Sequence, residues 1–278
     1  MAATVVSSNK SFKGRQYVYK HTSSTVNCDM TFGVYVPEHT EGEKLPTLLY
    51  LSGLTCTHAN FMEKSGFQQF ASKHRFVVVH PDTSPRGVDI EGDSESWDFG
   101  KGAGFYVNAT EAKWAKHYRM YDYVSKELLE VAATVAPIDA GKIGIFGHSM
   151  GGHGALVIGL RNPEKFQSIS AFAPISHPIT VPWGQKALTG YLGADESTWT
   201  VYDASEVLKN YRGPKRVILV DQGAADNFLA QLRPETLVST AKASVTVRMQ
   251  PEFDHSYYFI SSFIGDHFDH HAKTLTAL

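Results

Sequence analysis

The chain has little cysteine and no long apolar segment. Only Cys28 and Cys56 occur among its 278 residues, which excludes a framework of disulfides as the source of its stability. No apolar run reaches the roughly 18 residues that a membrane-spanning helix needs. The first residues, MAATVVSSNK, lack the apolar core of a signal peptide. These absences predict a cytoplasmic protein without a membrane partner.

Charge of either sign is also scarce. Charged residues make up 19% of the chain, the formal net charge is -2, and no run of lysine and arginine is present. Because nucleic acids and anionic membranes are bound through basic patches, neither partner is expected. Internal repeats, low-complexity segments and linker composition are absent as well, while 42% hydrophobic residues suffice for a large core. We therefore expect residues 1–278 to form a single domain.

Short apolar runs predict eight β-strands. The first two, at 15–20 and 30–36, alternate in polarity, which is typical of antiparallel strands with one exposed face. The next five are nearly continuous runs, which is typical of strands buried on both faces. They lie at 46–51, 76–80, 142–147, 168–174 and 215–221, and an eighth run lies at 244–250.

Helical patterns separate several of these strands. Apolar residues recur every three or four positions in 118–135, and weaker patterns lie at 60–74 and 231–243. Strands alternating with helices predict an α/β fold whose mostly parallel sheet is covered on both faces. The segment 81–116 fits neither pattern. It is rich in Gly, Ser and Asp and carries two tryptophans, so we expect a packed wall or lid over a site.

Glycines surround Ser149 in the stretch KIGIFGHSMGGHGAL, which spans 142–156. The pentapeptide GHSMG, at 147–151, has the form G-x-S-x-G between a buried strand and a helix, the context of a nucleophilic serine. Side chains at either end of this turn would collide with the neighbouring strand and helix, and Gly152 and Gly154 would let the helix pack closely against the sheet. The alternative is a phosphate-binding junction, but the spacing fits the G-x-G-x-x-G fingerprint poorly. We therefore interpret Ser149 as the nucleophile.

A serine hydroxyl needs a base to take its proton, and in this architecture the chain order is serine, acid, histidine. His255, just after the predicted strand at 244–250, fits the base, the alternative being a helix cap. His153 and His177 come before any suitable acid. Three further histidines have helical spacing and are interpreted as a solvated helix end, the alternative being an adventitious metal site: His267, His270 and His271.

The acid that orients the histidine is expected in the loop after the strand RVILV. Asp221 closes that strand, and Asp226 lies further into the loop. Spacing favours Asp226 slightly and leaves both open, while Asp254 is a local alternative that the chain order disfavours. The negatively charged oxygen of the tetrahedral intermediate needs two N–H donors, which we expect from Met150, after the nucleophile, and from Leu54, after the strand LLYL.

Several long stretches resemble the S-formylglutathione hydrolase (esterase D) family. They include LSGLTCTHANF, PDTSPRG, DFGKGAGFYVNAT, GHSMGGHGAL and DHSYYFI, and the similarity covers nearly the whole chain. The resemblance implies an α/β-hydrolase fold, with antiparallel N-terminal strands beside a parallel sheet. It implies hydrolysis of S-formylglutathione to glutathione and formate in formaldehyde detoxification, with no required cofactor, and it allows a homodimer.

The same resemblance assigns individual residues. It implies Ser149 as nucleophile, His255 as base and Asp226 rather than Asp221 as acid, and it matches Leu54 and Met150 to the oxyanion positions. It also implies that Cys56 borders the active site; the alternative is a buried filler residue.

Substrate contacts are expected around the cleft. Because glutathione carries two carboxylates and an amine, cations and polar donors should line its path. Lys101 and Lys186 are candidates, as is Arg86, while Trp97 and Trp183 would wall the cleft. The alternative for each is surface charge or core packing. Two other functions also fit the sequence: a carboxylesterase acting broadly on short acyl esters, and a hydrolase-fold binding protein without catalysis.

Overall fold

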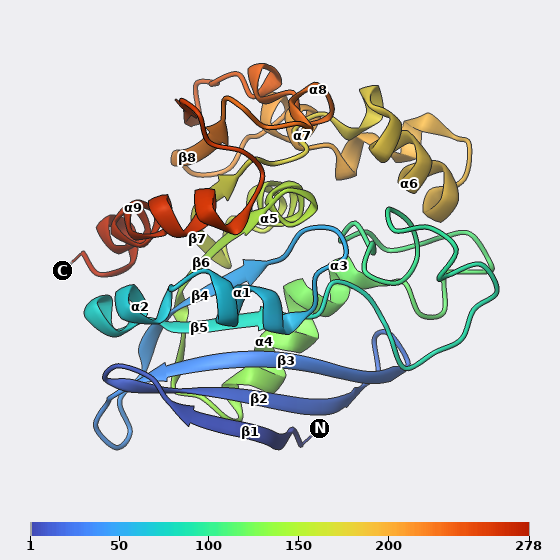
Figure 1. Ribbon diagram of the computed structural model, residues 1–278. Coiled ribbons are helices and arrows are strands. Elements are labelled where there is room, and N and C mark those ends of the chain that lie inside the picture. The colour runs from blue at the N-terminus through green and yellow to red at the C-terminus, as the bar shows by residue number, and fades with distance from the viewer. Residues whose placement is uncertain (1, 278) are drawn as a thin grey trace.

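A single nine-stranded sheet organises the part of the chain that the computed structural model describes, residues 2–277. The strand order is β1-β2-β3-β5-β4-β6-β7-β8-β9 (Figure 1). The first three strands pair antiparallel with one another and with β5, and β4 to β9 are parallel. The bounds are β1 Thr4–Lys10, β2 Gly14–Ser23, β3 Cys28–Pro37, β4 Leu45–Leu51, β5 Val77–Pro81, β6 Ile138–His148, β7 Phe166–Phe172, β8 Arg216–Gly223 and β9 Ala243–Gln250.

Helices cover both faces of this sheet, as the α/β prediction required (Figure 1). A side chain at Gly144 of β6 would meet His271 of helix α9, whereas Ile145, which points the opposite way, lies against Gly159 of α5. The helices are α1 His58–Lys64, α2 Gln68–His74, α3 Met120–Asp122, α4 Leu128–Ala133, α5 Met150–Arg161, α6 Pro182–Leu192, α7 Ala204–Lys209, α8 Leu229–Leu232 and α9 Tyr257–Leu275. The fold is therefore an α/β-hydrolase fold. Between residues 2 and 277, no helix is long and apolar enough to cross a membrane.

Some sequence predictions fail at polar or broken segments. The eight predicted strands are present, but β1 was missed because its sequence, TVVSSNK, is mostly exposed at the edge of the sheet. The helix expected at 231–243 is wrong, because α8 ends where Arg233 adopts a left-handed φ of 50° before Pro234. The helix expected at 60–74 divides into α1 and α2, with Gly66 at a φ of 68° between them. The helix expected at 118–135 is present, with a π-helical turn between α3 and α4.

The prediction of a solvated helix end for the last histidines is also wrong. His267 and His271 are completely buried, because this face of α9 packs on the sheet rather than facing water. A chain of hydrogen bonds connects them: His267 Nε2 to Asp221 Oδ2 at 3.0 Å, His267 Nδ1 to Ser170 at 2.8 Å, and Ser170 to His271 Nε2 at 2.9 Å. His270 is partly buried and bonds the Ile169 carbonyl. No metal-binding cluster forms among the described residues.

Asp221 carries the negative charge in this network. Burial alone would raise the pKa of its carboxyl, but hydrogen bonds from His267 and Arg248 outweigh burial and lower the pKa to about 2. Because the folded pKa is depressed, ionised Asp221 stabilises the fold above about pH 4, and that stabilisation is lost as the pH falls toward about 2. We expect the free energy of unfolding to fall by roughly 2 kcal/mol over this range from Asp221 alone. Denaturant titrations at both pH values, compared with Asp221→Asn, measure this contribution, and an equal fall in both proteins would contradict it.

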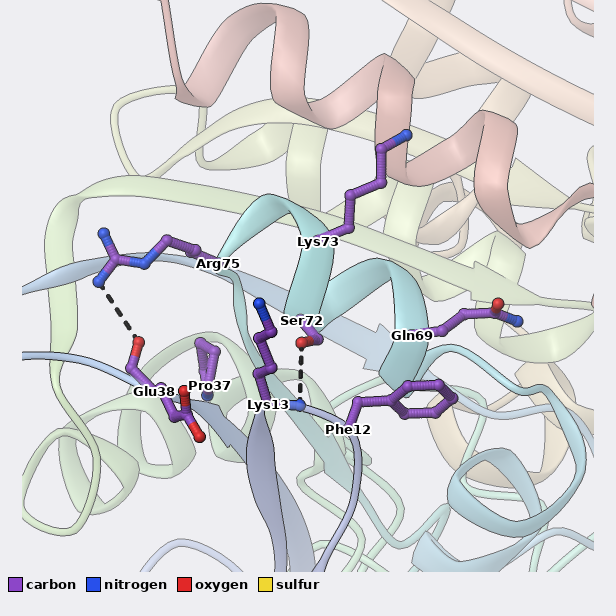
Figure 2. Close-up of a pocket in the computed structure, with 8 residues that line it drawn as sticks. All are labelled: Phe12, Lys13, Pro37, Glu38, Gln69, Ser72, Lys73 and Arg75. Carbon is purple, nitrogen blue, oxygen red and sulfur yellow. Dashed lines mark hydrogen bonds between the residues drawn. The ribbon is translucent and has the colours of Figure 1, made fainter.

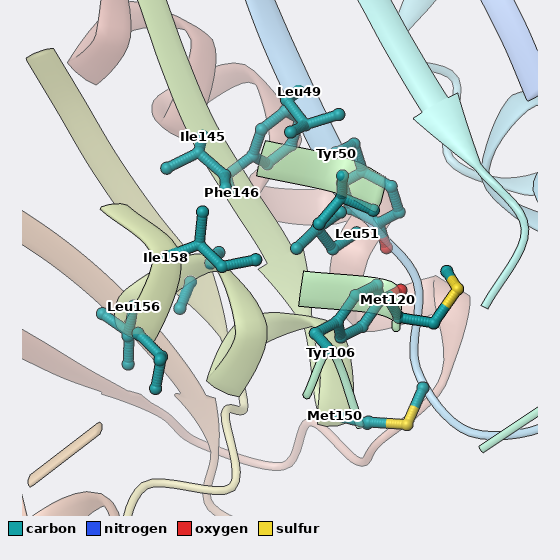
Figure 3. Packing of buried hydrophobic residues seen from close by; sticks show 14 of the residues in the cluster. Leu49, Tyr50, Leu51, Tyr106, Met120, Ile145, Phe146, Met150, Leu156 and Ile158 are labelled. Atoms are coloured by element: carbon teal, nitrogen blue, oxygen red, sulfur yellow. The ribbon is translucent and has the colours of Figure 1, made fainter. Parts of the chain in front are cut away.

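The core extends up to the turn that carries Ser149 (Figure 3). On β4 and β6, the rings of Tyr50 and Phe146 are both fully buried, with centroids 4.9 Å apart. Tyr106 is also buried, and its hydroxyl donates to the Ser52 carbonyl at 2.9 Å, which ties the loop after β4 to the segment beyond β5. Packed aromatic rings therefore hold the carboxyl ends of the central strands in place.

Candidate active site

Ser149 lies on a strained turn between β6 and α5. Its backbone has a φ of 58° and a ψ of -120°, a conformation that residues other than glycine rarely adopt. A Cβ atom at Gly147 would collide with the Gly151 carbonyl, and one at Gly151 would collide with the Leu51 carbonyl. Both glycines are therefore required, as the sequence predicted. The close approach of Gly154 is to the ring of Tyr106 rather than to the sheet, so that part of the packing prediction is wrong.

A cavity of about 290 Å³ opens over Ser149, at the carboxyl ends of the parallel strands. The residues that line it are Gly53, Leu54, Thr55, Cys56, Trp97, His148, Ser149, Trp183, Phe228, His255 and Tyr257. They come from the end of β6, from the loops after β4, β6, β8 and β9, from the start of α9, and from two wall segments, 82–119 and α6. The carboxyl edge of the sheet therefore brings together residues that are far apart in the sequence.

His255 and Asp226 are joined across this edge. The distance from His255 Nδ1 to Asp226 Oδ2 is 2.6 Å, and the Asp226 side chain is completely buried. Because a carboxylate only accepts hydrogen bonds, Nδ1 carries the proton and the Nε2 of a neutral imidazole is left as an acceptor. His255 lines the same cavity as Ser149, whose hydroxyl is not engaged in a hydrogen bond anywhere in residues 2–277. This arrangement suits a base that takes a proton from the hydroxyl.

The two other carboxylates that the sequence left open serve different partners. Asp221 is fully buried and binds Arg248 and His267, as described above. Asp254 accepts bonds from the backbone and hydroxyl of Ser256, next to the start of α9. Neither bonds to His255 among the described residues, so the geometry selects Asp226 as its partner.

Two backbone N–H groups at the cavity are free to donate. Met150 begins α5 and Leu54 lies in the loop after β4, and within residues 2–277 neither N–H donates a hydrogen bond. The loop of Leu54 is held by Thr55, whose N–H donates to the Gly102 carbonyl at 2.9 Å and whose φ is 68°. A positive φ at a β-branched residue is strained, which indicates a loop held in place by its surroundings. Free donors beside Ser149 suit a developing negative charge.

His148 places a second imidazole beside that of His255. Its ring centroid lies 4.4 Å from that of His255, and burial lowers the pKa of His148 well below its usual range, so His148 stays neutral. Burial also raises the pKa of the Cys56 thiol, which keeps Cys56 protonated and a poor nucleophile. Cys56 therefore lines the cavity as a neutral group.

Aromatic rings form one wall of the cavity. Trp97 lies edge-on to Trp183 at 5.6 Å, Trp183 lies 4.9 Å from Phe228, and Phe228 lies 5.2 Å from His255. Both predicted tryptophans thus lie in this wall. The segment 82–119, which carries Trp97, packs as a wall of the cavity. It forms no helix or strand, and its only regular pairings are isolated β-bridges.

The predicted cations do not line the cavity. Lys101 is paired with Asp89 at 3.2 Å, and Lys186 forms an ion pair with Asp98. Arg86 is similarly held by Asp82 at 2.9 Å. Arg86 and Lys101 lie in the segment 82–119 and Lys186 lies in α6, where neighbouring carboxylates hold all three side chains.

Sequence reasoning missed several residues that do line the cavity. They are Thr55, His148, Phe228 and Tyr257. Each lies within two positions of a residue that was predicted to act, so proximity in sequence to Leu54, Ser149, Asp226 and His255 was the available signal.

A larger groove, of about 630 Å³, lies elsewhere, between the turn after β1 and helix α2 (Figure 2). Its side chains include Lys13, Lys73 and Arg75, and no histidine is present among its described residues. Ser72 there accepts a hydrogen bond from the Lys13 N–H at 3.2 Å and has no base beside it in that lining. Size alone would select this groove, but its residues do not form an acyl-transfer site.

The chain is similar to known proteins in both sequence and structure. The family model described as a putative esterase matches residues 23–270. The S-formylglutathione hydrolase of Rattus norvegicus is 53% identical over 277 residues, which are 98% of this chain and 98% of that protein. The S-formylglutathione hydrolase of Arabidopsis thaliana is 50% identical over 276 residues, 97% of each chain. The solved S-formylglutathione hydrolase from Agrobacterium tumefaciens has a TM-score of 0.94 and 48% identity, covering 99% of this chain and 100% of that one.

Proposed function

The chain belongs to the S-formylglutathione hydrolase family of esterases and hydrolyses S-formylglutathione to glutathione and formate, and we propose that Ser149, His255 and Asp226 perform this reaction. The observation that carries the proposal is the 2.6 Å contact between His255 and Asp226 at the cavity that contains the Ser149 hydroxyl. Serine, histidine and aspartate in this arrangement are the groups that acyl transfer requires.

The first half of the reaction transfers the formyl group to the enzyme. His255 Nε2 takes the proton of the Ser149 hydroxyl as its oxygen attacks the thioester carbon, and Asp226 stabilises the resulting imidazolium. The N–H groups of Leu54 and Met150 donate to the negatively charged oxygen of the tetrahedral intermediate. When this intermediate collapses, the carbon–sulfur bond breaks, and the sulfur leaves as glutathione with the proton from His255.

The second half releases formate. The neutral imidazole of His255 takes a proton from water as the water oxygen attacks the formyl ester on Ser149. The same two N–H groups stabilise the second tetrahedral intermediate. Its collapse breaks the ester bond, returns the proton to the Ser149 oxygen and frees formic acid, which releases its remaining proton to solvent to give formate, so the enzyme is restored without a cofactor.

A broad esterase acting on short acyl esters is the second candidate, because the cavity is lined mainly by aromatic and small residues. A comparison of kcat/KM for S-formylglutathione and for a neutral acetyl ester distinguishes the two. We expect the thioester to be preferred; a higher kcat/KM for the plain ester would favour the second candidate. Labelling of Ser149 by an active-site phosphonate, located by mass spectrometry, tests the nucleophile separately.

Lys64 is our candidate for binding a glutathione carboxylate. It is exposed at the end of α1, and its Nζ lies 5.9 Å from the centre of the Tyr257 ring, which lines the cavity. Within residues 2–277 it has no carboxylate partner, whereas Lys101 and Lys186 are paired. A free cation at the rim is available to an anionic substrate.

Replacing Lys64 with glutamine should raise KM for S-formylglutathione about two- to fivefold, since an exposed charge pair contributes up to about 1 kcal/mol. The kcat and the hydrolysis of a neutral ester should not change, because Lys64 is not among the residues that line the cavity. Steady-state kinetics on both substrates measure this, with Lys186→Gln as a matched control. An equal KM effect in the two variants would contradict the assignment.

A further inference from the structure

A buried glutamine touches the carboxylate that orients His255. Gln222 lies near the end of β8 and is completely inaccessible to solvent. Its Nε2 lies 3.1 Å from Asp226 Oδ2 and 3.1 Å from the Gly223 carbonyl oxygen. Both neighbours are acceptors, so the amide NH₂ group must face them, and the orientation of the side chain is determined.

Gln222 contacts the same carboxylate oxygen of Asp226 as His255 does. Asp226 Oδ2 accepts from both Gln222 and His255 Nδ1, while Oδ1 accepts from the Phe228 N–H at 2.8 Å. The backbone donor and the glutamine hold the carboxylate from two sides, which prevents it from rotating about its Cβ–Cγ bond. The plane of the carboxylate then sets the direction in which the imidazole points.

Stability alone does not account for an amide at this position. Gln222 Oε1 is buried without a protein partner in the described residues, and burying such an oxygen is unfavourable compared with an apolar side chain of similar length. The favourable contribution of the side chain comes from its NH₂ group, and that group bonds to Asp226.

We propose that Gln222 is a positioning residue that fixes the Asp226 carboxylate and, through it, His255. This inference rests on the proposed roles of Ser149, His255 and Asp226. Gln222 does not touch the substrate cavity; it acts by holding Oδ2 in line with Nδ1 while the imidazole gains and loses its proton.

The chain offers a matched control. Gln250 also donates from its Nε2 to a buried aspartate, 2.8 Å from Asp221 Oδ1, but Asp221 bonds to Arg248 and His267 instead of His255. Gln222→Met and Gln250→Met each remove one amide donor from one carboxylate and retain the length of the side chain. We expect Gln222→Met to lower kcat for S-formylglutathione about tenfold, the loss of one hydrogen bond to a charged group, with KM within twofold. Gln250→Met should leave kcat unchanged.

Asp226→Asn separates failure of this inference from failure of the proposed function. If Asp226→Asn is inactive but Gln222→Met retains kcat within twofold, the role of Gln222 is wrong and the function stands. If Asp226→Asn retains full activity, both are wrong. Equal losses of kcat in Gln222→Met and Gln250→Met would also overturn the positioning role.

Gln222→Glu provides a second test if the methionine variant does not fold. A protonated glutamic acid can still donate to Asp226 Oδ2, whereas an ionised one repels it. The kcat of Gln222→Glu relative to that of the unmodified enzyme should therefore rise as the pH is lowered. A ratio that does not change with pH would exclude the proposed donor.

Discussion

Replacing Ser149 with alanine should lower kcat for S-formylglutathione by about 10⁶-fold, the loss seen when the nucleophile of a serine hydrolase is removed. The variant keeps its Cβ atom, the surrounding glycines and both free N–H groups, so its cavity should retain its shape. Single-turnover assays at high enzyme concentration measure the residual rate, and phosphonate labelling should be abolished. A residual kcat within tenfold of the original would show that another group attacks the thioester.

A glycine at the same position supplies a control based on backbone strain. Serine and alanine both have to adopt a φ of 58° and a ψ of -120° there, whereas glycine adopts positive φ freely. Ser149→Gly should therefore be as inactive as Ser149→Ala but more stable by about 1–3 kcal/mol. Equal stability of the two variants in denaturant titrations would mean that the turn stores no such strain.

Asp226→Asn should lower kcat by about 10⁴-fold with little change in stability, because the amide no longer holds the imidazole in the reactive tautomer. Asp221→Ala should do the opposite. It leaves Arg248 and His267 without their shared carboxylate, and removing one partner of a buried ion pair costs about 3–5 kcal/mol. We expect about 3 kcal/mol, since the Arg248 side chain is 33% exposed and water can replace part of the interaction.

Asp226→Asn and Asp221→Ala thus distinguish the two roles, because each variant should affect a different property. Rates normalised to the folded fraction, together with denaturant titrations, separate a catalytic defect from a structural one. Asp221→Ala should retain a kcat within a few-fold per folded molecule. If Asp221→Ala abolished turnover while Asp226→Asn remained active, the roles of the two residues would have to be exchanged.

Local patterns in the sequence predicted part of the fold and part of the site. Continuous apolar runs located the buried strands, and the glycines around Ser149 predicted the tight turn because backbone atoms occupy the space where side chains would be. The chain order of serine, acid and histidine then selected His255. Spacing alone could not separate Asp221 from Asp226, because the choice depends on contacts made only in the folded chain. Asp221, within β8, binds Arg248 and His267, whereas Asp226, in the loop beyond β8, binds His255.

Long-range packing explains the errors at the last histidines and at the predicted cations. His267 and His271 have polar side chains at helical spacing, so they resemble a solvated face until Asp221, Ser170 and Ser168 are brought against them by the sheet. Lys101 and Lys186 likewise look available until their acidic partners are known. In both cases the deciding contact is a hydrogen bond or ion pair between residues that no periodicity connects.

The origin of the two parts of the cavity has an evolutionary consequence. Groups proposed to break the thioester follow β4, β6, β8 and β9, while Trp97 lies in the connection between β5 and β6 and Trp183 in the connection between β7 and β8. After gene duplication, a descendant with altered connections would acquire a new acyl or thiol preference while inheriting the reactive groups intact.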